Sequence, residues 1–214
     1  MKITDAAVFP YPNGDTSVRR FALEAGALGF DSLVAIDTPS GTYGDVEVRS
    51  GIIFRDIPVR DIINRVKRFR GTDTVVSVKA GDAGFNRAVI GMKGVHILRG
   101  IHGADKTAFD HVSAKMAADN RVAVDIDLST IIATRGIARQ KAIARYRDIL
   151  VLEGRFEFPL TISTCARSVL DLRAVREISG LCSLLGMDIP AVEKTLAGVG
   201  TVTTPPVPAV RVIP

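Results

Sequence analysis

Short apolar runs rich in β-branched residues alternate with longer amphipathic stretches along most of the chain. Apolar runs of this length between turn residues are typical of buried strands, whereas apolar residues three and four apart indicate helices with one buried face. Seven runs predict strands, over residues 3–9, 33–36, 46–54, 74–79, 94–98, 123–126 and 158–163. The stretches between them predict helices over residues 17–28, 58–69, 83–92, 106–118, 135–152 and 171–185, with a last short helix that starts at Pro190.

This alternation predicts an α/β fold. Continuous apolar strands separated by helices form parallel sheets whose outer face the helices cover. Seven such units within 214 residues fit a small closed barrel better than an open, doubly wound sheet, although the pattern alone does not force that choice. No G-x-G-x-x-G follows the first strand, which disfavours a dinucleotide-binding sheet. We therefore predict a seven-stranded (β/α) TIM-like barrel as a single domain over residues 1–200, and an extended proline-rich C-terminal tail over 201–214.

The composition indicates an intracellular protein whose hydrophobic core needs no disulfide or structural metal. Hydrophobic residues make up 47% of the chain, enough to bury a core without disulfides or a structural metal. Cys165 and Cys182 form no C-x-x-C pair and are expected to be buried thiols. The N-terminus resembles no signal peptide, and no run approaches the roughly 20 apolar residues of a membrane helix. We predict a cytoplasmic protein without membrane contact.

Positive charge is unevenly placed along the chain. The formal net charge is +5, and residues 55–100 carry +6 while residues 131–180 carry +4. The segments 1–54 and 101–130 are acidic, at −3 and −2. Two basic blocks between acidic ones suggest a basic face that could bind nucleic acid, although an ordinary solvated surface would explain the same charge.

The second basic block contains a predicted helix with cations on several of its faces. They are Arg135, Arg139, Lys141, Arg145 and Arg147. Only Asp148 lies close enough along the chain to neutralise them, so we expect the cluster to be available to phosphates. An arginine fork pairs well with a phosphate, but an outer barrel helix without any ligand could carry the same residues.

A catalytic metal would need several ligands at the carboxyl ends of the strands, where barrel enzymes keep their active sites. The three histidines, His96, His102 and His111, form no H-x-H or H-E-x-x-H pair. Carboxylates and one histidine near the predicted strand ends could in principle gather around Mg²⁺ or Mn²⁺; these are Asp5, Asp37, His96, Asp125 and Asp127. Because several carboxylates near strand ends are expected by chance, we predict no metal bound by this chain.

Covalent catalysis has equally weak support. Lys79 ends a predicted strand, where a Schiff-base lysine could lie, but one lysine is a weak signal and an RNA or surface contact fits it better. Arg99 follows another strand and is a second candidate for such a contact. Cys165 lacks a recognisable histidine partner, and Ser163 and Ser168 lie outside any G-x-S-x-G motif. We predict no catalytic residue in this chain.

Several short motifs occupy the C-terminal half. Phe109-Asp110-His111-Val112 is followed by I-S-T-C-A-R-S over residues 162–168, D-L-R-A-V-R-E over 171–177, and L-L-G-M over 184–187. In this order they resemble ribonuclease P protein component three, the archaeal counterpart of the eukaryotic thirty-kilodalton subunit. Over residues 1–100 the resemblance is limited to the strand–helix order and to Leu28-Gly29-Phe30-Asp31.

That resemblance implies a seven-stranded barrel related to the polymerase-and-histidinol-phosphatase superfamily. It implies a part in the endonucleolytic removal of 5′ leaders from precursor tRNA, with the catalytic Mg²⁺ held by the RNA subunit. The expected partners are ribonuclease P RNA, precursor tRNA and a small ferredoxin-like protein component, with which the chain would form a heterotetramer. Enzymatic relatives carry H-x-H after the first strand, where this chain has Ala7-Val8-Phe9. A metal-dependent phosphoesterase of the same superfamily is the alternative function.

The motifs add three more candidate contacts, Arg167, Arg173 and Arg176. They could reach RNA or a partner protein, or could form ion pairs that fix the loop to the barrel. Ser168 is expected to cap the following helix, with Asp171 in its first turn.

Overall fold

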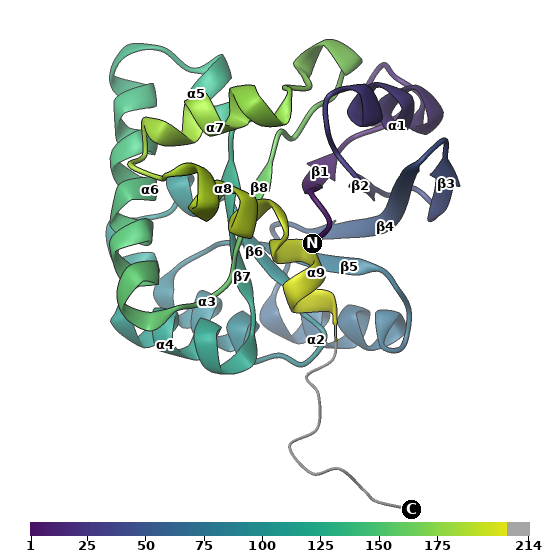
Figure 1. Cartoon of the computed structure of the whole chain (residues 1–214). Coiled ribbons are helices and arrows are strands. Elements are labelled where there is room, and N and C mark those ends of the chain that lie inside the picture. Colours follow the sequence, from purple (N-terminus) through teal and green to yellow (C-terminus); the bar gives the residue numbers. More distant parts are fainter. Residues whose placement is uncertain (205–214) are drawn as a thin grey trace, which may run out of the picture.

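Seven parallel strands curl into a nearly closed barrel in the computed structural model, which describes residues 1–204 (Figure 1). The strands are β1 (Thr4–Val8), β2 (Ser32–Ile36), β4 (Val46–Phe54), β5 (Val75–Lys79), β6 (Ile97–Arg99), β7 (Ala123–Asp127) and β8 (Leu160–Ser163). Each pairs with the next, and β8 returns to β1 through one bridge between Val8 and Ala166. The amide of Phe9 donates to the carbonyl of Ala166 at 2.8 Å, so the two ends of the sheet join. The predicted seven-stranded barrel is confirmed.

Helices cover the outside of this barrel. The longer ones are α1 (Val18–Ala27), α2 (Val59–Val66), α3 (Ala83–Ile90), α4 (His111–Asn120), α6 (Gly136–Phe156), α7 (Val175–Ser183) and α8 (Ile189–Leu196). Shorter pieces are α5 (Ser129–Ala133), α9 (Gly198–Thr203) and the 3₁₀ turns Lys67–Phe69, Ile101–Gly103, Lys106–Ala108 and Val169–Asp171. Of the helices in the described part of the chain, none combines the length and the apolar character needed to cross a membrane.

Polar residues set where several helices begin. Ser17 accepts a hydrogen bond from the amide of Arg20, and Asp82, Asp110 and Asp188 likewise accept from amides one turn into α3, α4 and α8. An oxygen at this position satisfies an amide that has no partner inside the helix. These local signals fix the residue at which each helix begins.

Alternate residues of β2 pack into separate apolar clusters. Leu33 and Ala35 of β2 belong to the large cluster between the strands and the helices. Val34 and Ile36 belong to a smaller cluster with Ala123 and Val199. Because neighbouring strand residues point to opposite faces, this smaller cluster fills the barrel interior, and Val199 brings α9 against it.

Several elements differ from those predicted; for example, the helix predicted over residues 106–118 begins only at His111, after the turn Lys106–Ala108. The segment between β2 and β4 contains a short strand, β3 (Gly41–Tyr43), antiparallel to β4, where we predicted a loop. The helix predicted over residues 171–185 begins only at Val175, because residues 169–171 form a separate 3₁₀ turn.

The predicted extended tail is wrong for residues 201–203, which belong to α9. The guanidinium of Arg121 donates to the carbonyl of Thr201, and Arg49 donates to the hydroxyl of Thr203 at 2.8 Å. These contacts and the burial of Val199 hold the helix against the barrel. The remainder of that prediction, residues 205–214, lies outside the described residues.

Candidate functional site

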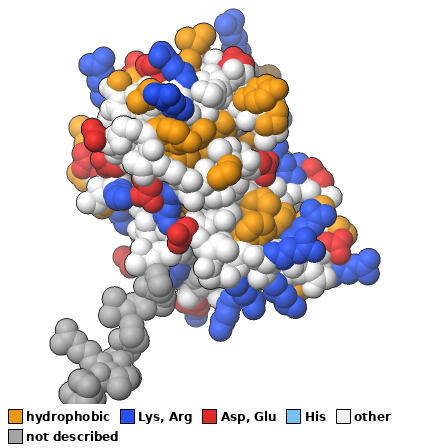
Figure 2. All heavy atoms as spheres, turned by 90° about the vertical axis from the view of Figure 1, so that its right-hand side faces the viewer, with side chains coloured by type: hydrophobic (Ala, Val, Ile, Leu, Met, Phe, Trp, Pro, Cys, Tyr) orange, Lys and Arg blue, Asp and Glu red, His pale blue; other side chains and the backbone are white. Residues whose placement is uncertain are grey.

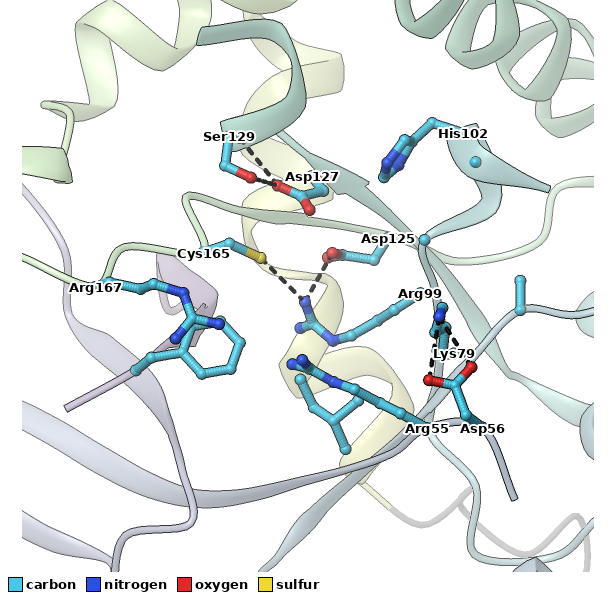
Figure 3. Close-up of a pocket in the computed structure, with 15 residues that line it drawn as sticks. Arg55, Asp56, Lys79, Arg99, His102, Asp125, Asp127, Ser129, Cys165 and Arg167 are labelled. Atoms are coloured by element: carbon cyan, nitrogen blue, oxygen red, sulfur yellow. Dashed lines mark hydrogen bonds and ion pairs between the residues drawn. The ribbon is translucent and has the colours of Figure 1, made fainter. Parts of the chain in front are cut away.

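The carboxyl ends of the strands surround a cavity of about 450 Å³ at the barrel mouth. Its polar lining is drawn in Figure 3: Arg55, Asp56, Lys79, Arg99, His102, Asp125, Asp127, Ser129, Cys165 and Arg167. Apolar atoms of Phe9, Ile53 and Ala80 complete the wall. This is the position at which barrel enzymes assemble their active sites.

Arg99 lies at the centre of the mouth and ties several strands together. Its side chain is only 6% exposed, and it donates to the carboxylate of Asp125 at 2.8 Å and to the hydroxyl of Ser163 at 3.2 Å. It also donates to the carbonyl of Ala6 in β1. Burial raises the pKa of Asp125, and the neighbouring Arg99 charge opposes that rise. The predicted RNA contact at Arg99 is therefore confined to what can enter the cavity.

Asp5 is a buried residue of β1 that contacts the segment after β8. Its carboxylate accepts from the amides of Ala7 and Thr164, at 3.1 and 3.0 Å, and from the Thr164 hydroxyl. Burial raises the pKa of Asp5 to about 6, against the opposing effect of these hydrogen bonds. Asp5 thus acts as a structural link between β1 and the segment after β8.

The candidate metal ligands do not converge. Asp5 is held by the contacts above, and Asp125 also accepts from the hydroxyls of Thr161 and Ser163 at 2.8 and 2.6 Å. Asp37 accepts from the side chain of Asn13 at 3.2 Å. His96 precedes β6, where its Nδ1 accepts from the amide of Val76 at 3.0 Å, so the prediction that it lies at the mouth is wrong. Within residues 1–204, no group of three or more His, Cys, Asp or Glu side chains is arranged to hold a metal ion.

His102 enters the mouth from the 3₁₀ turn that follows β6. Its Nδ1 lies 2.9 Å from the hydroxyl of Tyr146, a fully buried residue of α6. The same hydroxyl accepts from the amide of Asp127 at 3.0 Å, while the Asp127 carboxylate accepts from the amide and hydroxyl of Ser129. Burial lowers the pKa of His102. This network anchors α6 to the rim, and the sequence motifs did not indicate it.

Phe9 lies at the barrel mouth, directly after β1. Arg55, which follows β4, holds its guanidinium carbon 5.4 Å from the centre of the Phe9 ring, and Arg167 holds its own at 4.6 Å. Arg167 also donates to the carbonyl of Asn13 at 2.6 Å. Arg55 was not among the predicted contacts, because an isolated arginine after a strand has no distinguishing pattern.

Lys79 and Cys165, the two residues considered for covalent chemistry, lie in surroundings that do not favour it. The Nζ of Lys79 is held in an ion pair with Asp56 at 2.9 Å. Burial raises the pKa of Cys165 well above its usual value, so the thiol is a poor nucleophile.

The basic helix α6 offers fewer open charges than predicted. Arg145 is buried, and burial lowers its pKa, so the expectation that all five cations are available is wrong for this residue. Arg139 donates to the carbonyl of Thr134 at 2.8 Å, and Arg147 donates to that of Leu184 at 2.7 Å. Arg135 and Lys141 are exposed.

The loop after β8 is held by hydrogen bonds rather than by the ion pairs considered above. Ser168 caps the turn Val169–Asp171, and the Asp171 carboxylate accepts from the amides of Ser168 and Arg167. The capping role of Ser168 is confirmed, although the capped element is this turn. Arg173 donates to the carbonyls of Leu170 and Leu172, whereas Arg176 is exposed on α7.

A second basic surface lies on α2 and the turn after it. It consists of five exposed cations: Arg60, Arg65, Lys67, Arg68 and Arg70. Among the described side chains, the only ion pair of this set joins Arg60 to Asp61 at 3.6 Å. Figure 2 shows Lys and Arg side chains gathered along the lower part of the face that contains α2. We refer to these five residues as the α2 surface.

Comparison with known proteins gives this geometry a context. Residues 2–200 match the family described as RNase P subunit p30. The chain belongs to the RNase P subunit p30 family. Its relatives include ribonuclease P protein component 3 of Halorubrum lacusprofundi, 31% identical over 92% of this chain and 89% of the relative. The counterpart in Methanococcoides burtonii is 29% identical over 86% of this chain and 79% of the relative. The resemblance seen in the sequence motifs is confirmed.

Solved structures agree with the RNase P subunit p30 family in fold. A chain of archaeal ribonuclease P with mature tRNA superimposes with a TM-score of 0.76, covering 92% of this chain and 89% of that one, at 19% identity. An organophosphorus hydrolase from Deinococcus radiodurans gives a TM-score of 0.53 at 11% identity, covering 95% of this chain and 93% of that one. At these identities the likenesses show the barrel alone and carry no activity to this chain.

Proposed function

We propose that this chain acts as a protein subunit of ribonuclease P that supports the catalytic RNA during removal of 5′ leaders from precursor tRNA. The observation that carries the proposal is the match to the RNase P subunit p30 family over nearly the whole barrel, residues 2–200. In this proposal the chain contributes charge and shape, and the catalytic Mg²⁺ is held by the RNA.

The α2 surface is the strongest candidate for contact with RNA. Most of its side chains have no carboxylate partner among the described residues, so their charge is available to offset phosphate repulsion. Arg135 and Lys141 at the start of α6 form a second candidate, with Arg176 on α7 as a further exposed cation. Helix α6 runs along the left of Figure 1, whereas α2 lies at the lower right, so the two surfaces can serve different partners.

Protein partners belong to the proposal as well. We propose that one surface meets the small ferredoxin-like protein component and that the pair assembles into a heterotetramer. Arg147 and Arg173, whose guanidinium groups already bind backbone carbonyls, then act mainly in holding α6 and the loop after β8 in place.

Reconstitution with ribonuclease P RNA and the companion proteins tests the proposal. Leader cleavage from precursor tRNA is compared for the complete particle, for a particle without this chain, and for two charge variants. One variant replaces Arg65, Lys67 and Arg68 with glutamine, and the other replaces Arg135 and Lys141. We expect omission of the chain to impair cleavage. We expect the α2 variant to bind RNA more weakly, and the slope of its log binding constant against log salt concentration to become shallower by about three, one for each cation removed.

The α6 variant serves as the internal comparison. A loss of RNA binding confined to this variant would move the RNA contact to α6, and a loss of protein assembly without loss of RNA binding would assign α6 to a partner. Full cleavage by a particle that lacks the chain would refute the proposed function.

A further inference from the structure

Two arginines at the barrel mouth hold like charges close together without a carboxylate between them. Arg55 and Arg167 both lie over the ring of Phe9, at 5.4 and 4.6 Å from its centre. Among residues 1–204, no carboxylate lies within ion-pair distance of either guanidinium, although nine such pairs form elsewhere. These two distances place the guanidinium carbons within about 10 Å of each other, so the two charges repel, and a bound anion would offset that repulsion.

The space beside these arginines is large enough for a small ligand. The mouth cavity of about 450 Å³ is joined at Arg55 and Arg167 by a second hollow of about 300 Å³, which Asn13, Asp37 and Arg65 also line. Ligand pockets usually measure roughly 300 to 1,000 Å³. A phosphate group alone would leave most of this volume empty, and the apolar wall of Phe9, Ile53 and Ala80 suits a flat organic group.

The carboxylates of the mouth do not cancel its charge. Asp56 pairs with Lys79, and Asp125 pairs with Arg99. Asp127 accepts from Ser129 and lies on the far side of Arg99 from Arg55 in Figure 3. Asp37 lines the second hollow together with three cations, Arg55, Arg65 and Arg167, so this part of the cavity keeps a net positive charge.

We propose that the barrel mouth binds the phosphate group of a nucleotide, with Arg55 and Arg167 as its contacts and the apolar wall beside the sugar and base. A planar guanidinium fork is suited to phosphate oxygens, and its stacking on Phe9 holds each fork in place before the ligand arrives. The nucleotide can be the phosphorylated end of an RNA chain or a free mononucleotide, because both present the same group. The site needs neither a metal nor the rest of ribonuclease P.

Calorimetric titration of the purified full chain tests the proposal. The ligands are AMP, adenosine, and a short single-stranded RNA with and without a 5′-phosphate. We expect AMP or the phosphorylated RNA to bind, and adenosine and the unphosphorylated RNA to bind at least about tenfold more weakly. Preference for AMP identifies a free nucleotide as the ligand, and preference for the phosphorylated RNA identifies a chain end.

Variants then assign the binding to this cavity. Arg55→Gln is the main variant, since none of the hydrogen bonds among residues 1–204 uses its side chain, and Arg55→Gln with Arg167→Gln is the second. Arg19→Gln with Arg20→Gln on α1 removes two exposed charges away from the mouth and is the matched control. We expect each Arg55 variant to weaken binding about tenfold or more and the control to leave it unchanged.

Equal weakening by variant and control, or no phosphate-dependent binding at millimolar ligand, overturns the proposal. The result is separate from that of reconstitution, because the isolated chain can bind a nucleotide whether or not the particle needs it. Conversely, a subunit with an empty mouth could still support leader cleavage.

Discussion

The substitution Asp5→Asn should stabilise the barrel at neutral pH. The carboxylate of Asp5 is buried at the seam between β1 and the segment after β8, and it accepts two amides and the Thr164 hydroxyl. An asparagine can keep this geometry, because its Oδ1 can accept both amides while its Nδ2 donates to the hydroxyl oxygen of Thr164. The substitution then removes a buried charge, keeps both contacts with the amides and reverses the third hydrogen bond, in which Thr164 becomes the acceptor.

The size of the effect follows from the pKa of Asp5. Burial raises it from 3.8 to about 6, and this difference corresponds to about 3 kcal/mol, at roughly 1.4 kcal/mol per pH unit. Between these values the folded protein keeps the proton while the unfolded chain releases it, so the contribution of Asp5 to stability falls as pH rises from about 4 to about 6. Above pH 6 the group is ionised in both states, and the full cost of about 3 kcal/mol is present.

Urea unfolding of wild type and Asp5→Asn at pH 4.5 and at pH 8 measures this directly. The advantage of the variant should be larger at pH 8 than at pH 4.5, by roughly 2 kcal/mol. Asp73→Asn, at an exposed position, is the matched control and should change the unfolding free energy by at most a few tenths of a kcal/mol at either pH. An Asp5→Asn protein that is less stable than wild type by the same amount at both pH values would refute the reasoning.

Other substitutions test the packing around the same barrel by urea unfolding. Arg99→Met should destabilise the protein by about 3–5 kcal/mol, because it leaves Asp125 buried without its partner. Adding Asp125→Leu should restore much of that loss, and no recovery would contradict the assigned cost of the unpaired carboxylate. Tyr146→Phe should cost about 1–2 kcal/mol, since the amide that donates to its hydroxyl stays buried, and an unchanged stability would show that water replaces the hydroxyl. Gly198→Ala should be strongly destabilising, because its Cβ would lie 1.8 Å from a carbonyl oxygen of β8. Gly180→Ala on α7, where a Cβ would meet nothing within 4 Å, should be neutral or stabilising by up to about 1 kcal/mol. Similar effects of the two substitutions would argue against close packing of α9.

Much of the fold could be predicted because its strands are apolar throughout and its helices carry polar caps. β5 and β7 appear at nearly their predicted bounds, since a buried parallel strand needs a continuous apolar run. β3 was missed because a three-residue strand of mixed burial has no periodicity to detect. α9 was missed because its Gly198-Val199-Gly200 start reads as a turn, and only packing against the barrel end makes it a helix.

The candidate site was harder to predict than the fold. Spacing identified cations on α6 but could not show that Arg145 is buried or that Arg139 and Arg147 bind backbone carbonyls. The arrangement of Arg55 and Arg167 over Phe9 joins residues far apart in the chain, so it exists only once the barrel has closed. Long-range contacts of this kind leave no local pattern in a single sequence.

The division of labour between protein and RNA can be measured most directly with the same preparation of this chain in two assays. In the first, the chain alone is incubated with Mg²⁺ or Mn²⁺ and either a phosphate ester or precursor tRNA; in the second, ribonuclease P RNA and the companion proteins are added. We expect hydrolysis only in the second assay, as leader cleavage. Metal-dependent hydrolysis by the chain alone, abolished by substitutions at the barrel mouth, would contradict this expectation.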